Sequence, residues 1–368
     1  MRLRIATPGD ADLLRRWEQA TQVREAGALG WDWDVQLHED VDWRQSLVAE
    51  VDGRAIGFIE WIDTAREPEG WFGDIGEGIH AIDLWIGEAD ALGQGHGTAM
   101  MRRVLAACFA DPATRAVIVD PLQSNLAAQR FYRRLGFQVQ ADADLHGDAC
   151  RLMRLERADW VAAVEAPVLG LDPAQVLDFW FGVPGPATAV AQRQAGLWWS
   201  KDEAVDARIA RDFDAAVLAA GSGGLQRWLD TPEGWLALLI VCDQFPRNIH
   251  RDTPLAFAFD VRARQRCRQG IEAGLLERLD PLGRVFALLP LEHAEDAALQ
   301  TECVQRFQAL AASVGEADRQ TFEGFLDFAR RHKVVIDRFG RYPHRNRILG
   351  RRSTPEERTY LAQPGAGF

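Results

Sequence analysis

The sequence lacks paired cysteines. Its five cysteines are odd in number, far apart and nowhere arranged as Cys-x-x-Cys: Cys108, Cys150, Cys242, Cys267 and Cys303. Neither a disulfide framework nor a zinc site is indicated, so we expect buried free thiols in a reducing compartment and no bound metal.

Long apolar runs are also missing. The first ten residues, MRLRIATPGD, already carry Asp10 and lack the apolar core of a signal peptide. The longest apolar stretch, Trp235–Cys242, is far too short to cross a bilayer. We therefore expect a cytoplasmic protein without a membrane partner.

Positive charge is scarce in the first half. Residues 1–165 contain no lysine, and their 17 arginines face 28 acidic residues, which gives −11 of the chain's net charge of −12. Residues 25–90 hold 17 of these acids and three arginines, whereas residues 91–134 hold six arginines and two aspartates. Such an acidic surface repels nucleic acid and favours a cationic partner, unless the acids serve only solubility.

Strand-like and helix-like patterns alternate in this half. We expect strands at residues 3–6, 46–51, 55–62, 81–86, 116–119 and 150–155, and helices at residues 10–20, 98–110 and 125–135. Asp52-Gly53 predicts a two-residue hairpin turn, and residues 21–44 are expected to be irregular. The mixture predicts an α/β domain over residues 1–165, with a central mixed sheet and flanking helices.

The second half is punctuated by helix starts. Five dipeptides join a capping residue to proline: Asp172-Pro173, Thr231-Pro232, Thr253-Pro254, Asp280-Pro281 and Thr354-Pro355. Each fits an N-cap followed by proline at the first helical position. We expect an all-α domain at residues 171–368, after a linker at residues 166–170.

A glycine-rich turn lies between a predicted strand and a predicted helix. It reads Gly93, Gln94, Gly95, His96, Gly97 and Thr98. Glycines let backbone amides approach a ligand, and a helix start attracts phosphate. Arg102 and Arg103 in the following helix are the best cations for such phosphates, although a turn of this kind also occurs as plain structure.

A second motif makes the turn more specific. Asn125, Ala128, Tyr132, Gly136 and Phe137 fit the pattern Asn-x-x-Ala-x-x-x-Tyr-x-x-x-Gly-Phe. With both motifs, residues 1–157 resemble the GNAT superfamily of acetyltransferases. The resemblance implies that the turn and Asn125 bind acetyl-CoA. Leu92 departs from the usual Gln or Arg at the start of the loop, which removes one side-chain contact but leaves the backbone cradle.

Residues 70–137 look most like the aminoglycoside 6'-N-acetyltransferases. The similar stretches are Gly70-Trp71, Ile82-Asp83, Asp111-Pro112 and Asp120-Pro121 with Asn125. In that family the aspartates matched by Asp83 and Asp120 face the cleft and bind ammonium groups of the drug; otherwise they are a solvated strand residue and a turn residue. Trp31, Trp33 and Trp71 are further candidates for contact with a sugar or cation, or for simple packing.

The resemblance implies direct attack of an amine on the acetyl thioester. Backbone amides near Trp85 and Ile86 would polarise the carbonyl, and Tyr132 would protonate the leaving thiolate. A carboxylate that pairs with an ammonium raises the pKa of that ammonium, so one acid does not easily both bind and deprotonate the same amine. We therefore assign amine anchoring to Asp83 and proton acceptance to Asp120.

These features predict an N-acetyltransferase that acts on a primary amine of a small cationic substrate such as an aminoglycoside. One alternative is a GNAT enzyme for an endogenous amine, namely a polyamine, amino sugar, siderophore or lysine side chain. Another is an acetyl-CoA-sensing module whose helical half recruits a partner.

Residues 171–352 resemble an uncharacterised bacterial helical family, number 924 among the domains of unknown function. The resemblance rests on residues 177–182, 243–248, 290–293 and 338–346, and it implies stacked helix pairs of the tetratricopeptide type without a known activity. These stretches and their surroundings concentrate Asp243, Arg247, His293, His332, His344 and Arg345. Such a cluster binds an anionic ligand or a protein, or only caps and pairs helices. The helix face that His332 shares with Phe325, Phe328 and Ile336 predicts a core histidine.

Overall fold

The computed structural model describes residues 1–27, 30–145 and 147–367. It divides into two compact units. The first comprises Met1–Ala163 with the short segments Asp252–Leu255 and Arg347–Arg352, and the second comprises Val164–Arg251, Ala256–Asn346 and Ser353–Phe368.

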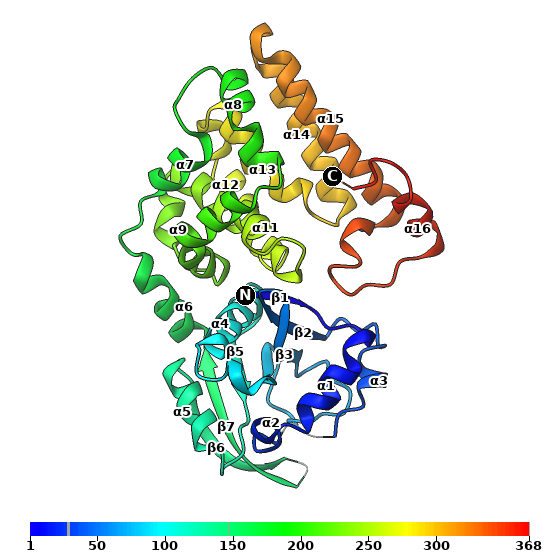
Figure 1. Cartoon of the computed structure of the whole chain (residues 1–368). Helices are drawn as coiled ribbons and strands as arrows, with labels where there is room; N and C mark the ends of the chain where they lie inside the picture. The colour runs from blue at the N-terminus through cyan, green and yellow to red at the C-terminus, as the bar shows by residue number, and fades with distance from the viewer. Residues whose placement is uncertain (28–29, 146, 368) are drawn as a thin grey trace. The chain divides into compact units, whose positions relative to one another are not determined.

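The first unit is built on one seven-stranded sheet in the order β1-β2-β3-β4-β5-β7-β6 (Figure 1). The strands are β1 (Arg2–Ile5), β2 (Arg44–Val51), β3 (Arg54–Asp63), β4 (Ile79–Ile86), β5 (Ala116–Val119), β6 (Gln138–Leu145) and β7 (Asp148–Glu156). Among the described residues, only β4 and β5 pair in parallel. The predicted α/β class with a mixed sheet is confirmed.

The hairpin between β2 and β3 turns at the predicted dipeptide. Val51 pairs with Arg54, and Asp52 and Gly53 between them have φ of 50° and 77°. Tight hairpin turns of the primed type require a left-handed backbone at both positions, which aspartate tolerates and glycine favours.

Helices cover both faces of this sheet. They are α1 (Ala11–Glu18), α2 (Thr21–Arg24), α3 (Trp33–Gln36), α4 (His96–Cys108), α5 (Leu126–Arg134) and α6 (Arg157–Glu165), the last of which crosses into the second unit. Trp17 of α1 and Trp33 of α3 pack with Phe58 and Trp85 of the sheet in one apolar cluster. The expectation of an irregular segment at residues 21–44 is wrong in part, because α2 and α3 each form one turn there; the Asp32 carboxylate accepts the Val35 amide and caps α3.

The described part of the second unit contains helices and turns and no strand, which confirms the all-α prediction. Its helices are α7 (Pro173–Phe181), α8 (Ala187–Trp199), α9 (Glu203–Gly221), α10 (Pro232–Leu239), α11 (Phe245–Ile249), α12 (Asp260–Glu272), α13 (Pro281–Glu292), α14 (Ala297–Ser313), α15 (Glu316–Phe339) and α16 (Pro355–Leu361). Within residues 1–27, 30–145 and 147–367, no helix combines the length and apolar character needed to cross a membrane.

Four of the five predicted N-caps are confirmed. Asp172, Thr231, Asp280 and Thr354 each accept an amide of the first turn of α7, α10, α13 and α16, with proline at the first helical position. The fifth dipeptide, Thr253-Pro254, precedes only the single 3-10 turn Pro254–Ala256.

Candidate active site

Three carboxylates line up across neighbouring strands of the first unit. Glu60 on β3 stands directly opposite Asp83 on β4. Because β4 and β5 run parallel and pair Ala81 with Ile118, Asp83 and Asp120 lie two residues further along their chains and on the same face. We call Glu60, Asp83 and Asp120 the carboxylate row.

Ionisation of the carboxylate row is energetically unfavourable. Glu60 is 2% exposed, accepts a hydrogen bond from the Ser46 hydroxyl, and its burial raises its pKa to about 6. Burial also raises the pKa of Asp120 to about 6. The pKa of Asp83 rises well above its ordinary value because of desolvation and the charges of Asp120 and Glu60. The three groups therefore hold their protons to a higher pH than ordinary carboxyls do, and a bound cation would displace those protons.

Asp83 is the member of the row that solvent reaches. Its side chain is exposed although protein atoms surround it closely enough to raise its pKa. These two facts together describe a recessed carboxylate that remains open to a ligand. Asp120, directly after β5, is half-buried.

Tyr132 lies close enough to Asp83 and Asp120 for their charges to affect the pKa of its hydroxyl. It is 7% exposed on α5, and its ring packs edge-on against Phe131 and Phe137 at 5.2 and 5.6 Å between centroids. Burial, then Asp83 and Asp120, raise the pKa of its hydroxyl. Tyr132 therefore keeps its proton at neutral pH, as a general acid requires.

Asn125 positions the helix that carries Tyr132. Its side-chain oxygen accepts the Ala128 amide at 3.0 Å and caps α5. The structure thus shows a capping role for Asn125, while contact with the co-substrate stays a prediction.

One edge of β4 is open beside the row. The ladder with β5 covers Ile79 to Ala81, and among the described residues the rest of β4, Ile82 to Ile86, pairs only with β3. Trp85 and Ile86 lie in this stretch. Backbone amides along such an edge are free to donate to an acyl oxygen.

The glycine-rich turn has open space beside its backbone. Gly93 and Gly95 have φ of 73° and 82°, and a Cβ built on either meets no atom within 4 Å. Gly95 is the N-cap of α4, which begins at His96 and includes Gly97 and Thr98 in its first turn; no side chain among the described residues caps it. The Gln94 side chain donates to the Asp90 carbonyl at 2.6 Å. Open space and uncapped amides suit a diphosphate, so the turn fits acetyl-CoA.

The two arginines predicted to bind the phosphates of the co-substrate contact other groups in the structure. Arg102 lies over the Trp160 ring at 5.9 Å, and Arg103 donates to the Met1 carbonyl at 2.9 Å. Both have partners away from the turn, and phosphate binding by them stays a prediction.

The tryptophans divide between core and surface. Trp33 is 1% exposed, with Trp31 stacked on it at 5.3 Å and 6°. The expectation that Trp33 presents a ring to a ligand does not fit this position, because the neighbouring rings of Trp31, Phe58 and Trp85 enclose it. Trp31 is half-buried and Trp71 is 38% exposed, so these two remain candidates.

Glu60 is the site residue that the sequence interpretation missed. The available signal was an acid within the otherwise apolar strand Gly57-Phe58-Ile59-Glu60-Trp61-Ile62. Its place opposite Asp83 depends on strand register, which a single sequence does not specify.

Two family models match the chain. The model described as acetyltransferase (GNAT) domain matches residues 7–145, and the model described as bacterial protein of unknown function (DUF924) matches residues 176–365.

Individual proteins are similar to one or the other half. Aminoglycoside N(6')-acetyltransferase type 1 of Klebsiella pneumoniae is 28% identical over 148 residues, which span 38% of this chain and 74% of that protein. A solved protein of unknown function from Agrobacterium tumefaciens is 35% identical and covers 54% of this chain and 99% of its own, with a TM-score of 0.45. The aminoglycoside acetyltransferase AAC(6')-Ib, solved with coenzyme A and kanamycin, is 26% identical over 43% of this chain and 96% of its own, with a TM-score of 0.40. Both resemblances inferred from the motifs are confirmed.

Proposed function

This chain belongs to the bacterial family of unknown function DUF924 and begins with a GNAT acetyltransferase domain related to the aminoglycoside 6'-N-acetyltransferases, and from this premise we propose that it acetylates a primary amine of a small, multiply charged cation of the aminoglycoside type. The observation that carries the proposal is the carboxylate row beside the open edge of β4.

The row favours substrates with several ammonium groups. Burial raises the pKa values of Glu60, Asp83 and Asp120, and the charges of Asp120 and Glu60 raise that of Asp83 further. A bound ammonium offsets both effects. Asp83 is open to solvent and serves as the anchor for an amine that does not react. A substrate with a second amine can then present that second, reacting amine to Asp120.

Proton transfer falls to two residues on different elements. Acetyl-CoA supplies the acetyl group as a thioester. Asp120, with a pKa of about 6, is mostly ionised at neutral pH and accepts the proton of the reacting amine at a carboxylate oxygen. The Tyr132 hydroxyl is protonated at that pH and donates its proton to the leaving sulfur. Amides of the open β4 edge near Trp85 and Ile86 stabilise negative charge on the acyl oxygen.

Release of free thiol from acetyl-CoA across an amine panel tests the proposal. Kanamycin and tobramycin are expected to support turnover, with spermidine, glucosamine and free lysine as competing substrates. Preferred turnover of one of the latter amines contradicts the aminoglycoside assignment and favours an endogenous amine. Binding of coenzyme A by calorimetry without turnover of any amine favours a sensing role and contradicts catalysis.

A further inference from the structure

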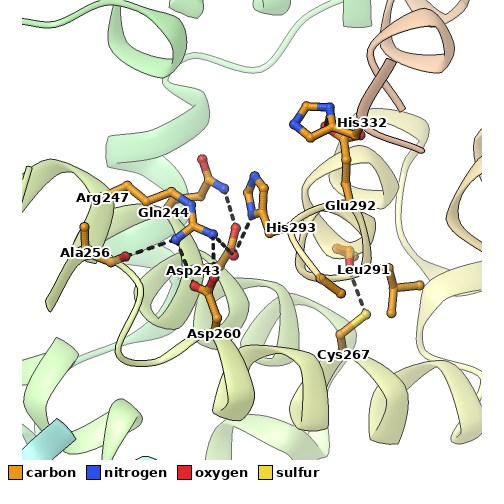
Figure 2. A network of polar contacts seen from close by, with 12 residues as sticks. Asp243, Gln244, Arg247, Ala256, Asp260, Cys267, Leu291, Glu292, His293 and His332 are labelled. Atoms are coloured by element: carbon orange, nitrogen blue, oxygen red, sulfur yellow. Dashed lines mark hydrogen bonds and ion pairs between the residues drawn. The ribbon is translucent and has the colours of Figure 1, made fainter. Parts of the chain in front are cut away.

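Three of the four stretches that carry the family resemblance of the second half meet at one place. Residues 243–248 include the end of the π-helical turn Ile240–Gln244 and most of α11, residues 290–293 end α13, and residues 338–346 follow from the end of α15. Figure 2 shows the polar side chains of residues 243–248 and 290–293 near one another, together with Asp260 of α12 and His332 of α15. From residues 338–346, the Tyr342 hydroxyl donates to the Glu292 carbonyl and Arg345 pairs with Asp260. Buried polar groups stabilise a fold less than apolar groups of the same size, which makes such a convergence a candidate for function.

Prolines shape both helix ends at this place. Pro246 lacks the N–H that would continue a regular helix, and the preceding turn is π-helical, with the Phe245 amide bonded to the Ile240 carbonyl. Pro290 lies inside α13. Turns of the π type are often found at functional sites, and this one carries Asp243.

Asp243 is a buried carboxylate with three polar partners. It is 2% exposed, accepts hydrogen bonds from His293 Nδ1 at 2.8 Å and Gln244 Nε2 at 2.5 Å, and lies 3.3 Å from the Arg247 guanidinium. Arg247 is itself fixed by Asp260 at 2.9 Å. Burial alone would raise the pKa of Asp243, but Arg247 and His293 lower it below its ordinary range. Asp243 is therefore ionised.

His293 is oriented by this carboxylate. Because Nδ1 donates to Asp243, the neutral imidazole presents its lone pair at Nε2. Burial, followed by Arg247, lowers the pKa of His293, so the ring is neutral at pH 7. Its Nε2 has no hydrogen-bond partner among the described residues, and its side chain is 16% exposed. This is the arrangement of a general base with an open position.

Glu292, which directly precedes His293, is a second buried titratable group. Its side chain is 6% exposed, receives no hydrogen bond from the part of the chain that the structure describes, and lies 3.3 Å from His332 Nδ1. Burial, followed by Asp243, raises the pKa of Glu292 to about 8, so it is protonated at neutral pH. The His332 ring lies 6.4 Å from that of His293, between centroids. The base and the acid are thus consecutive residues at the end of α13, and both lie close to His332.

We propose that the helical unit holds a second catalytic site, in which His293 activates a water molecule for the hydrolysis of a small ester. Within the described residues no Ser, Thr or Cys side chain is bonded to His293. The nearby Cys267 thiol instead donates to the Ala287 carbonyl. Water is therefore the nucleophile.

The reaction balances without a co-reactant. His293 Nε2 takes one proton from water, and the water oxygen bonds to the ester carbonyl carbon. The bond from that carbon to the alcohol oxygen breaks, and Glu292 protonates the departing oxygen. The proton on His293 returns to Glu292 through solvent, which leaves one acid and one alcohol.

Hydrolysis of p-nitrophenyl acetate by the full chain, without acetyl-CoA, is the first test. His293→Gln is expected to lower the rate above buffer by about 100-fold or more, and Asp243→Asn to lower it comparably because the ring loses its orientation. The matched control is His38→Gln, which removes an exposed histidine of the first unit and leaves the rate unchanged. A His293→Gln rate equal to that of the unaltered chain overturns the proposal.

The acid role of Glu292 is tested by varying the leaving group of the ester. A p-nitrophenolate departs without a proton, whereas phenolate departs more readily with one, so Glu292→Gln is expected to slow phenyl acetate more than p-nitrophenyl acetate. Equal slowing of both esters contradicts the acid role.

A measurement on the unaltered chain tests the role of His293 even if the variants do not fold. Diethyl pyrocarbonate acylates neutral, accessible imidazoles, and peptide mass spectrometry locates the product. We expect modification of His293 in step with loss of ester hydrolysis. Loss of hydrolysis while His293 stays unmodified overturns the proposal.

Discussion

At the scale of single residues, two aspartates of one sheet face have different surroundings. Asp83 is solvent-open with its pKa raised well above the ordinary range, whereas Asp120 is half-buried with a pKa of about 6. A pKa of about 6 leaves Asp120 mostly ionised at pH 7 and basic enough to take a proton. The roles proposed for Asp83 as anchor and Asp120 as base rest on this difference.

Asp120→Asn is expected to lower kcat for kanamycin by about 100-fold or more, since an amide does not accept the proton. Asp83→Asn is expected to raise KM mainly. Steady-state kinetics with thiol detection checks both, and Asp40→Asn, at an exposed position outside the row, is the matched control. Full turnover by the Asp120 variant with only weakened affinity would rule out the base role.

The raised pKa values predict how binding depends on pH. Glu60 and Asp120 titrate near 6, above their ordinary values of 4.5 and 3.8. Their contribution to stability is therefore fully present below those ordinary values and is lost as pH rises through about 6, where the row ionises at a cost that a cation relieves. Kanamycin affinity, measured by calorimetry without acetyl-CoA, should strengthen as pH rises from 5 to 8. Affinity that stays flat across this range contradicts a titrating row.

At the scale of elements, the glycine-rich turn depends on backbone conformation. Gly95 has φ of 82° at the start of α4, and a left-handed alanine costs about 1–2 kcal/mol. Gly95→Ala should therefore weaken coenzyme A binding about tenfold. Gly170→Ala, at a glycine with open space and no left-handed φ, is the control. Unchanged affinity in the Gly95 variant means that the turn does not hold the coenzyme.

The helix caps of the second unit predict a stability effect. The Thr231 hydroxyl accepts the Gly234 amide at 3.1 Å, so Thr231→Ala should lower the free energy of unfolding by about 1 kcal/mol. Thr301 lies exposed within α14 and caps no helix start. Thr301→Ala should therefore change stability less, as judged by urea unfolding, and an equal loss in both variants argues against the cap.

At the scale of the whole molecule, the chain divides into two compact units. A ligand raises the melting temperature only of the unit that binds it. Coenzyme A should therefore raise one of two calorimetric transitions and leave the other in place. A single transition that shifts as a whole would show that the units unfold together.

Several features of this molecule were readable from local sequence alone. The Asp52-Gly53 turn, the caps at Asp172 and Thr231, and the motif around Tyr132 depend on residues only a few positions apart. Turn geometry and helix capping act over that distance, which is why the α/β and all-α halves could be predicted.

Other features were decided only by the tertiary structure. Glu60 faces Asp83 because of strand register, Trp33 is enclosed because α3 folds onto the sheet, and Asp243 meets His293 because separate helices pack together. Phe328, predicted to share a buried face with His332, is 47% exposed, whereas His332 is 7% exposed. The sequence by itself determined which chemical groups are available and which local shapes they adopt. Register and packing decided which groups meet, because they join residues far apart in the chain.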